Sequence, residues 1–532
     1  MKRVYHNAVV YTGKWPLCQA FAVEDGRFLF AGSDAEALAL PADERIDLGG
    51  AFVCAGFNDS HMHVLNFGQS LTAAQLHLHT QSLDDMIACL RAQKPGRGGW
   101  IVGRGWNQDF FAGEKRMPTR WDLDRVSLKH PVVATRACGH ALCVNSRALE
   151  LLAITADTPQ IAGGEIVMEN GAPNGVFLDN AMDLVLDRIP APDREGVKNM
   201  LRAAMKALGA YGVTSCQSDD YCAFHALNWR EVNAAYRELE AAGEMTVRVY
   251  EQSNFADTGA LAQFIAEGNT TGAGTDFFKI GPLKLLGDGA LGARTAYLSR
   301  SYADAPDTRG LSVFTPEQFD ALIGLANEHG MQIAVHCIGD ACLDLVLGSL
   351  DKALAAHPRV DHRHGIVHCQ ITRADQLERI AKMGLHVYCQ SIFLDYDIHI
   401  VRERAGEALA QTSYSWKTLM NKGATVSNGS DCPVELPRVL LGIQCAVTRR
   451  DLKLCAPYLP DEAFTVREAI DSFTSAGAHA SFEENVKGQI APGMLADFVI
   501  LGGNPYETDA ERIKDIPVLA TYVGGKCVYK TE

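Results

Sequence analysis

The middle of the chain alternates short apolar runs with longer stretches of helical periodicity. This pattern predicts parallel strands joined by helices, because fully buried strands are apolar throughout. Eight such strands predict a (β/α)8 barrel, whose site lies at the carboxyl ends of the strands. The predicted strands are Ala51–Phe57, Gly212–Gln217, Thr246–Glu251, Phe278–Leu286, Met331–His336, Gly365–Cys369, Leu385–Gln390 and Ala424–Asn428. The predicted helices between them include Val197–Leu208, Trp229–Ala242, Pro316–His329 and Arg373–Met383.

Both ends of the chain have the pattern of short strands joined by turns. Near the start, the runs Gln19–Val23 and Arg27–Gly32 flank a hairpin turn at Glu24-Asp25-Gly26. Near the end, Phe498–Leu501 and Ala520–Val523 are apolar. We therefore expect residues 1–55 and 485–532 to form one small β-sandwich domain and residues 56–484 to form the α/β barrel.

The stretch between the first two barrel strands is too long for one connection. It contains the strand-like runs Trp100–Gly103 and Pro131–Thr135 and a helical run at Ser146–Leu152. A segment of this size within a barrel predicts an inserted subdomain, at about residues 66–195, that covers the site.

The composition excludes some classes of protein but does not indicate which reaction the protein catalyses. The chain has 532 residues, of which 47% are hydrophobic and 21% charged, as in soluble globular proteins. A net charge of -15 argues against a nucleic-acid-binding surface. The sequence has no membrane-spanning run and no secretory signal pattern, and its 15 cysteines are scattered. These features predict a cytoplasmic protein with reduced thiols and no membrane partner.

The strongest local signal is the sequence Asp59-Ser60-His61-Met62-His63, which follows an apolar run. Residues two apart on a strand point to the same face, so His61 and His63 can bind one cation. A single pair of histidines two residues apart is weak evidence for a metal site, because two loop histidines can have this spacing by chance. The pair His77-Leu78-His79 is such a case, and we assign it no role.

Further metal-ligand types stand at the ends of other predicted strands. His336 ends one apolar run, His368 ends another, and Asp431 follows the stretch Thr425–Ser430. A single buried histidine is more often a hydrogen-bonded core residue than a ligand. Four histidines and one aspartate at carboxyl ends of strands favour a metal site over that alternative.

Two lysines lie in the apolar strand before Gly287-Asp288-Gly289. An isolated buried ammonium group is costly, so Lys284 needs a partner, a route to solvent or a special role. Lys279 has a similar apolar setting, and the residues alone do not choose between the two.

Longer motifs make a family resemblance specific. The chain resembles the amidohydrolase superfamily, and within it the amidohydrolase 3 group that includes N-substituted formamide deformylases. The stretches that carry the resemblance run almost end to end, and Ala55, Asp179 and Ser391 depart from the usual pattern. They include 55–63, 105–108, 122–124, 139–140, 144–146, 288–296, 335–340, 429–434 and 492–497.

The resemblance implies a role for each metal-ligand candidate. His61 and His63 would bind one metal ion with Asp431 beside it, and His336 and His368 would bind a second. Lys284 would bridge both ions as a side-chain carbamate, which fits its spacing to Asp288-Gly289. Two zinc ions are expected, although one metal held by the histidines and Asp431 could run the same reaction.

Substrate contacts are harder to predict. His140 resembles a family position that reaches toward the site. Asp288 and Arg294 are candidates on the loop after the fourth strand, and a loop-ordering ion pair between them is an equal alternative. Trp106 is a further candidate, for which packing inside the insertion is the alternative.

These observations predict an enzyme that uses metal-activated hydroxide to cleave an amide-type C–N bond, other than a peptide bond, in a small molecule. Asp431 would carry the proton. An N-substituted formamide or N-acyl compound is the first expectation, and a cyclic amide or deamination is the alternative. A catalytically silent binding protein is disfavoured, because every expected ligand is present. The assembly is left open, with a homodimer as one expectation.

Overall fold

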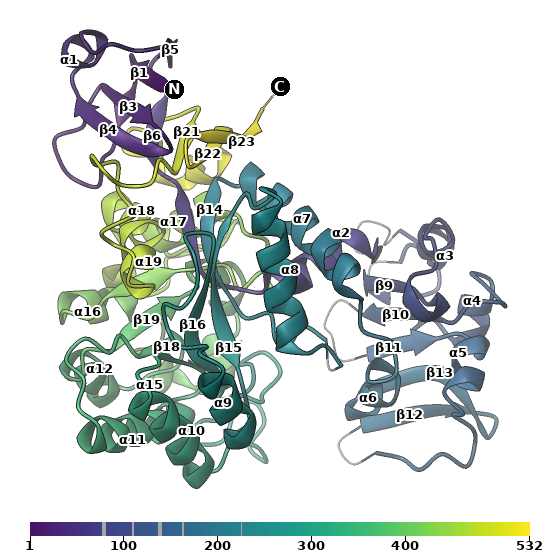
Figure 1. Ribbon diagram of the computed structural model, residues 1–532. Coiled ribbons are helices and arrows are strands. Elements are labelled where there is room, and N and C mark those ends of the chain that lie inside the picture. The colour runs from purple at the N-terminus through teal and green to yellow at the C-terminus, as the bar shows by residue number, and fades with distance from the viewer. Residues whose placement is uncertain (77–80, 109–110, 137–140, 162–163, 225, 532) are drawn as a thin grey trace. The chain divides into compact units, whose positions relative to one another are not determined.

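The chain divides into two compact units in its computed structural model (Figure 1). The structure describes residues 1–531 apart from 77–80, 109–110, 137–140, 162–163 and 225. Unit 1 comprises residues 1–64, 205–220 and 240–532, and unit 2 comprises residues 65–204 and 221–239.

A sheet of eight parallel strands forms the centre of unit 1. The sheet is a nearly closed barrel, because the Asp431 amide just beyond the last strand donates to the His61 carbonyl of the first, at 2.8 Å. In order around the barrel, the strands are β7 (Phe57–Met62), β14 (Val213–Ser218), β15 (Arg248–Asn254), β16 (Phe278–Leu286), β17 (Ile333–Cys337), β18 (Gly365–His368), β19 (His386–Cys389) and β20 (Val426–Asn428).

The prediction for the first barrel strand is wrong. The apolar run Ala51–Phe57 is divided between β6 (Phe52–Ala55), which belongs to another sheet, and the start of β7. Gly56 separates the two strands and lies so close to Thr214 that a Cβ atom there would be 2.2 Å from its side chain. As a result, the polar residues up to His61 lie inside the first barrel strand, where they are buried, instead of following it.

Helices of unit 1 pack against the barrel through their apolar faces. α10 begins after the capping residue Thr315 with Pro316, whose missing N–H costs nothing at that position, and it buries Phe319 and Leu322. None of the described helices is both long and apolar enough to cross a membrane. The helices that lie wholly in unit 1 are α1 (Asp34–Leu38), α9 (Thr258–Ala266), α10 (Pro316–Glu328), α11 (Asp340–Ala356), α12 (Ala374–Lys382), α13 (Leu394–Asp397), α14 (Val401–Ala405), α15 (Glu407–Ala410), α16 (Trp416–Asn421), α17 (Val439–Thr448), α18 (Val466–Ser472) and α19 (Ser475–Ala480).

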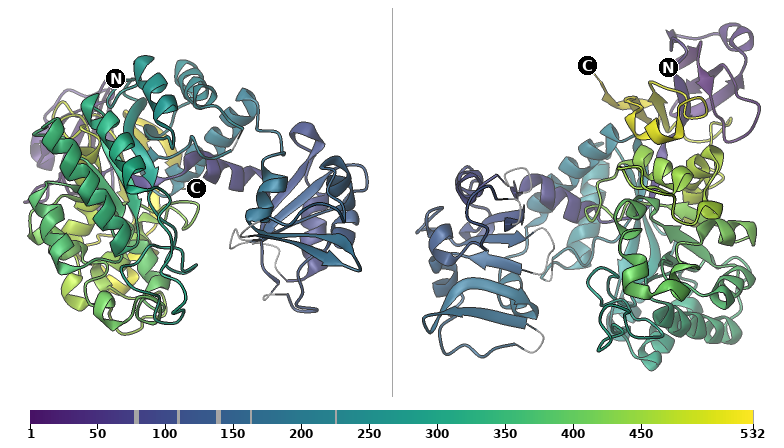
Figure 2. Two further views of the ribbon diagram at one scale, coloured as in Figure 1. Left: turned by 90° about the horizontal axis from the view of Figure 1, so that it is seen from below. Right: turned by 180° about the vertical axis from the view of Figure 1, so that it is seen from behind.

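The two ends of the chain meet in two small sheets of unit 1. One sheet has the order β4-β3-β1-β5 and the other the order β2-β6-β21-β22-β23, so the second combines both termini. The amino-terminal strands and the carboxyl-terminal strands lie side by side in Figure 1 and in the right-hand view of Figure 2. The strands are β1 (Lys2–His6), β2 (Val9–Val10), β3 (Ala20–Glu24), β4 (Arg27–Gly32), β5 (Glu44–Asp47), β6, β21 (Phe498–Leu501), β22 (Val518–Val523) and β23 (Lys526–Lys530).

A shared aromatic core joins these two sheets. Phe21 stacks on Tyr5 with ring centroids 4.7 Å apart, and Phe498 packs edge-on against both rings. The predicted hairpin turn is present, because Asp25 and Gly26 have φ angles of 50° and 78° between β3 and β4. The grouping of these strands as a β-sandwich, and the predicted domain boundaries, stay predictions.

Unit 2 contains a six-stranded sheet of its own, with the order β12-β13-β11-β10-β9-β8. Two hydrophobic clusters lie in this unit, one around Leu142 and Phe177 and the other around Leu90 and Trp106. The strands are β8 (Ala74–Gln75), β9 (Ile101–Trp106), β10 (Val132–Arg136), β11 (Ala141–Val144), β12 (Gly164–Glu169) and β13 (Ala172–Asp179). The helices wholly in unit 2 are α3 (Leu83–Arg91), α4 (Arg120–Asp124), α5 (Ser146–Leu151) and α6 (Asp183–Leu186), while α2 (Val64–Thr72), α7 (Arg194–Ala210) and α8 (Trp229–Ala241) extend across the unit boundaries.

Candidate metal centre

The first barrel strand and the loop after the last one are joined by a set of hydrogen bonds. The Asp431 amide donates to the His61 carbonyl, and the His63 amide donates to the Cys432 carbonyl, both at 2.8 Å. The buried Asp59 carboxylate accepts bonds from the Ser430 amide at 3.0 Å and the Ser430 hydroxyl at 2.5 Å. These contacts place the His61–His63 pair beside Asp431, although the pair belongs to the first barrel strand and Asp431 follows the last.

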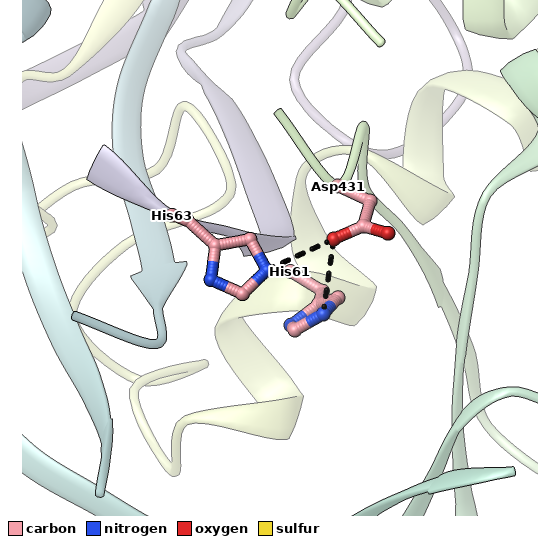
Figure 3. Close-up of side chains that lie close together, drawn as sticks. All are labelled: His61, His63 and Asp431. Atoms are coloured by element: carbon pink, nitrogen blue, oxygen red, sulfur yellow. Dashed lines mark hydrogen bonds and ion pairs between the residues drawn. The ribbon is translucent and has the colours of Figure 1, made fainter. Parts of the chain in front are cut away.

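Both histidines of the pair point at one oxygen of Asp431 (Figure 3). The Nε2 atom of His61 lies 3.4 Å from Asp431 Oδ1, and that of His63 lies 3.1 Å from the same oxygen. The three potential ligand atoms lie within 4.8 Å of one another. His61 is fully buried and the other two are mostly buried, so a cation here would be largely shielded from bulk water.

The hydrogen bonds of the other ring nitrogen fix the tautomer of each histidine. The Nδ1 atom of His61 donates to Gln252 Oε1 at 2.7 Å, and that of His63 donates to the Asp219 carbonyl at 2.8 Å. Because Nδ1 carries the proton, Nε2 presents a lone pair. Three lone-pair donors therefore converge with no proton between them, which suits a divalent cation bound by imidazole and carboxylate.

The two remaining histidines continue the same cluster. The ring centroid of His368 lies 5.5 Å from that of His61 and 4.4 Å from that of His336. His368 donates from Nδ1 to Gln390 Oε1 at 2.7 Å, which leaves its Nε2 free of a proton. His336 donates from Nε2 to the Gly289 carbonyl at 3.2 Å, so its Nδ1 carries the lone pair.

Burial keeps these rings in the neutral form that metal ions bind. Burial, assisted by the Lys284 ammonium, lowers the pKa of His61 and lowers that of His336 to about 3. Burial and the neighbouring His336 lower the pKa of His368 well below its usual range. A neutral imidazole needs no deprotonation before it binds a cation.

The surroundings of the two lysines on β16 differ. Lys279 has an ordinary explanation, since its Nζ atom forms an ion pair with Glu483 at 2.6 Å. Lys284 is completely buried, and its ion-pair partner among the described residues is the equally buried Asp219, at 3.4 Å. The main chain of Asp219 in turn accepts the bond from His63, so Lys284 lies beside the histidine cluster.

Two candidate substrate contacts have other partners in unit 1. The Asp288 carboxylate accepts bonds from the amides of Tyr297, Ile338 and Gly339, at 2.8, 3.0 and 2.8 Å. Arg294 forms an ion pair with Asp304 at 2.5 Å, so the alternative of an Arg294–Asp288 pair is wrong about the partner. The reason is that backbone amides already bind both Asp288 oxygens. Substrate contact by either residue stays a prediction.

The other two candidate contacts belong to the predicted insertion. Trp106 lies in unit 2, where it is buried in a hydrophobic cluster and its indole N–H donates to the Ala134 carbonyl at 2.9 Å. These contacts agree with the packing alternative, and a role in substrate binding stays a prediction. His140 and the pair His77 and His79 lie outside the described residues.

Three supporting residues escaped the sequence analysis. Gln252 and Gln390 orient two of the histidines, but glutamine inside a strand carries no signal of such a role. Asp219 could have been found, because it lies just beyond the predicted strand Gly212–Gln217, as Asp431 lies just beyond another predicted strand.

Comparisons with known proteins agree with this arrangement. The model of the amidohydrolase family matches residues 44–529. The chain is 34% identical to “Putative amidohydrolase YtcJ” of Bacillus subtilis, over 100% of both chains. It is 27% identical to an N-substituted formamide deformylase of Arthrobacter pascens, over 96% of this chain and 95% of the relative. A crystal structure of an uncharacterized metal-dependent hydrolase from Pyrococcus horikoshii has a TM-score of 0.80 at 27% identity, covering 96% of this chain and 99% of the other.

Proposed function

The chain belongs to the amidohydrolase family, and from that premise we propose that it hydrolyses an amide-type C–N bond in a small molecule. The observation that carries the proposal is the convergence of His61 and His63 on one oxygen of Asp431. Lone pairs that face one another in a buried site repel, and a cation between them would remove that repulsion. The name of the formamide deformylase relative favours N-substituted formamides and other N-acyl compounds as first substrates.

The residues that would hold metal form two groups. His61, His63 and Asp431 would hold one ion, and His336 and His368 a second. Imidazole and carboxylate ligands suit zinc, which we propose as the native metal, with a single ion as the alternative. A bound divalent ion would lower the pKa of a water molecule to near neutrality and polarise the substrate carbonyl.

Lys284 would join the two groups as a carbamate. Its neutral amine would add to the carbon of carbon dioxide and release a proton, which gives a negatively charged side chain. The charge then suits a buried position between two cations, whereas an ammonium group there would repel them. Complete burial and a rather long ion pair to Asp219 support this assignment.

Asp431 would move the proton during the reaction. Its carboxylate lies at the end of the barrel, and Oδ1 is within 3.4 Å of two histidine nitrogens, so it borders the space where water and substrate would meet. It would accept the proton of the attacking water and deliver it to the leaving nitrogen. The same residues could serve hydrolysis of a cyclic amide or a deamination.

The test is a hydrolysis screen of the zinc-reconstituted protein over formamides, N-acyl amino acids, lactams and aryl amides. Asp431→Asn removes the proton acceptor while keeping the size of the side chain. We expect kcat/KM of that variant to fall by about 100-fold or more on any active substrate.

The matched control is Asp451→Asn, which changes an equally buried aspartate that accepts a bond from the Cys455 amide. It should keep its turnover. Failure of the zinc-supplied protein to bind metal would contradict the proposal. Metal binding without turnover on any substrate class would favour a silent binding protein instead.

A further inference from the structure

The backbone at the end of β18 departs from regular strand geometry. Val367 is paired with His336 in the parallel sheet, so it shares the face that His336 presents to the site, and it packs with Ala334 and Tyr388. On a regular strand the next side chain would point to the opposite face. His368 nevertheless reaches the interior cluster, because its φ is 73° and that of Cys369 is 50°. The left-handed turn therefore determines that His368 enters the site at all.

This turn is unfavourable by itself and needs support. A left-handed conformation costs roughly 1–2 kcal/mol for a residue other than glycine. Two carbonyl groups, those of His368 and Cys369, lie in the turn. A buried carbonyl without a hydrogen-bond donor adds a further penalty, so a donor that reaches both groups stabilises the turn.

Trp416 supplies that donor from the first residue of α16. Its indole N–H lies 3.1 Å from the His368 carbonyl and 3.2 Å from the Cys369 carbonyl, so one proton is shared between both groups. The side chain is buried, and it is held in place by the ring of Tyr414, with centroids 5.5 Å apart. The Tyr414 amide donates to the Gln370 carbonyl at 2.7 Å, which fixes the residue after the turn.

We propose that Trp416 is the positioning residue of His368: its indole N–H holds the left-handed turn that directs the His368 ring toward the metal ligands. The inference rests on the proposed metal centre. In this proposal Trp416 does not contact the substrate. Replacement of Trp416 should therefore affect the reaction only through the position of one metal ligand, His368.

Two variants test this role. Trp416→Phe removes the N–H and part of the ring. Replacement of Trp416 by 3-benzothienylalanine removes the N–H and keeps the ring size, so it decides the matter where Trp416→Phe fails to fold. The control is Tyr458→Phe, which removes another buried side-chain donor, the hydroxyl that bonds the backbone carbonyl of Ala410 at the end of α15.

The measurement is cobalt binding, followed by the visible spectrum that reports the geometry around Co²⁺. We expect both Trp416 variants to bind the ion about tenfold more weakly than the natural protein and to change its spectrum. Tyr458→Phe should leave both unchanged. Equal affinities and spectra in all proteins would overturn the inference, as would an equal change in Tyr458→Phe. If the natural protein bound no cobalt or zinc, the proposed function itself would fail, and this inference with it.

Discussion

At the scale of single residues, Lys279 and Lys284 on β16 differ in their ion pairs, and this difference indicates which of them serves the metal site. Lys279 has an ordinary structural role, because it forms an ion pair with Glu483 at 2.6 Å and part of its side chain reaches solvent. Lys284 has no exposed surface, and its ion pair to Asp219 is longer, at 3.4 Å. The pairing of Lys279 favours Lys284 as the lysine that serves the metal site, although carboxylation of its side chain stays a proposal.

Exchange of each lysine for methionine separates these roles. Lys284→Met should reduce bound zinc and remove most of the hydrolytic activity, because no bridging group could form. Lys279→Met should keep its zinc and lose only stability, since it breaks the ion pair with Glu483 at the start of β16, whereas Lys284 lies near the carboxyl end of that strand. Metal analysis of the purified variants, with chemical denaturation beside it, checks both. Equal zinc content in Lys284→Met and the natural protein would exclude a bridging lysine.

The ligand candidates could be predicted from the sequence because each is a metal-binding residue type at the end of a predicted strand. His336 and His368 end apolar runs, and Asp431 follows the predicted strand Ala424–Asn428. Gln252 and Trp416 could not be predicted in this way. Their roles depend on bonds to residues 191 and 48 positions away, to His61 and His368, and neither type is typical of metal sites.

At the scale of elements, β16 is tied to the segment after α19 through a charged cluster. Burial alone would raise the pKa of the Glu483 carboxyl, but the ammonium groups of Lys487 and Lys279 outweigh it and lower the pKa to about 2. The two ion pairs measure 2.6 Å each. Because the folded protein binds this proton less readily than the unfolded chain, the carboxylate stabilises the fold.

The cluster predicts a specific loss of stability in acid. The contribution of Glu483 should be complete above about pH 4.5, the ordinary value, and should disappear as the pH falls toward about 2. Glu483→Gln should lower the free energy of unfolding at pH 7 by about 3 kcal/mol, because two lysines lose their partner. Its stability should also fall less steeply in acid than that of the natural protein. Denaturant titrations at a series of pH values measure both slopes, and parallel slopes would contradict the assignment.

Element types could be predicted more easily than the sheets to which the elements belong. The run Phe278–Leu286 is a strand with the predicted bounds, because it is mostly apolar, with Lys279 and Lys284 as its charged residues, and ends at Gly287. The prediction of one barrel strand at Ala51–Phe57 was wrong, because the apolar residues on the two sides of Gly56 are buried in different sheets. A hydrophobic pattern predicts that a residue is buried, but it does not predict with which strand that residue's own strand pairs.

At the scale of the whole molecule, the proposed ligands come from strands across the entire barrel. β7 carries His61, β16 carries Lys284, β17 and β18 carry His336 and His368, and Asp431 follows β20. A metal ion bound by this set would link the first strand to the last. The cytoplasmic location and the homodimer stay predictions at this scale.

Metal removal should therefore weaken the fold of unit 1. A ligand that binds only the folded state at a free concentration of 100 times its Kd adds about 2.7 kcal/mol to the free energy of unfolding. We expect a chelator to lower the midpoint of thermal unfolding and added zinc to restore it. Calcium, which prefers oxygen ligands, should not restore it. A midpoint of thermal unfolding that changes with neither the chelator nor added zinc would argue against a metal centre.

The five-stranded sheet has a consequence for how the protein is made. β6 pairs with β2 on one side and β21 on the other, and Gly56 leads from it directly into β7 with the His61–His63 pair. A ribosome thus completes every proposed ligand while one edge of β6 still lacks its neighbour. Until Phe498–Leu501 emerges, that open edge is a place where another nascent chain can add a strand. A segment synthesised after every proposed ligand therefore protects the strand that leads into the site.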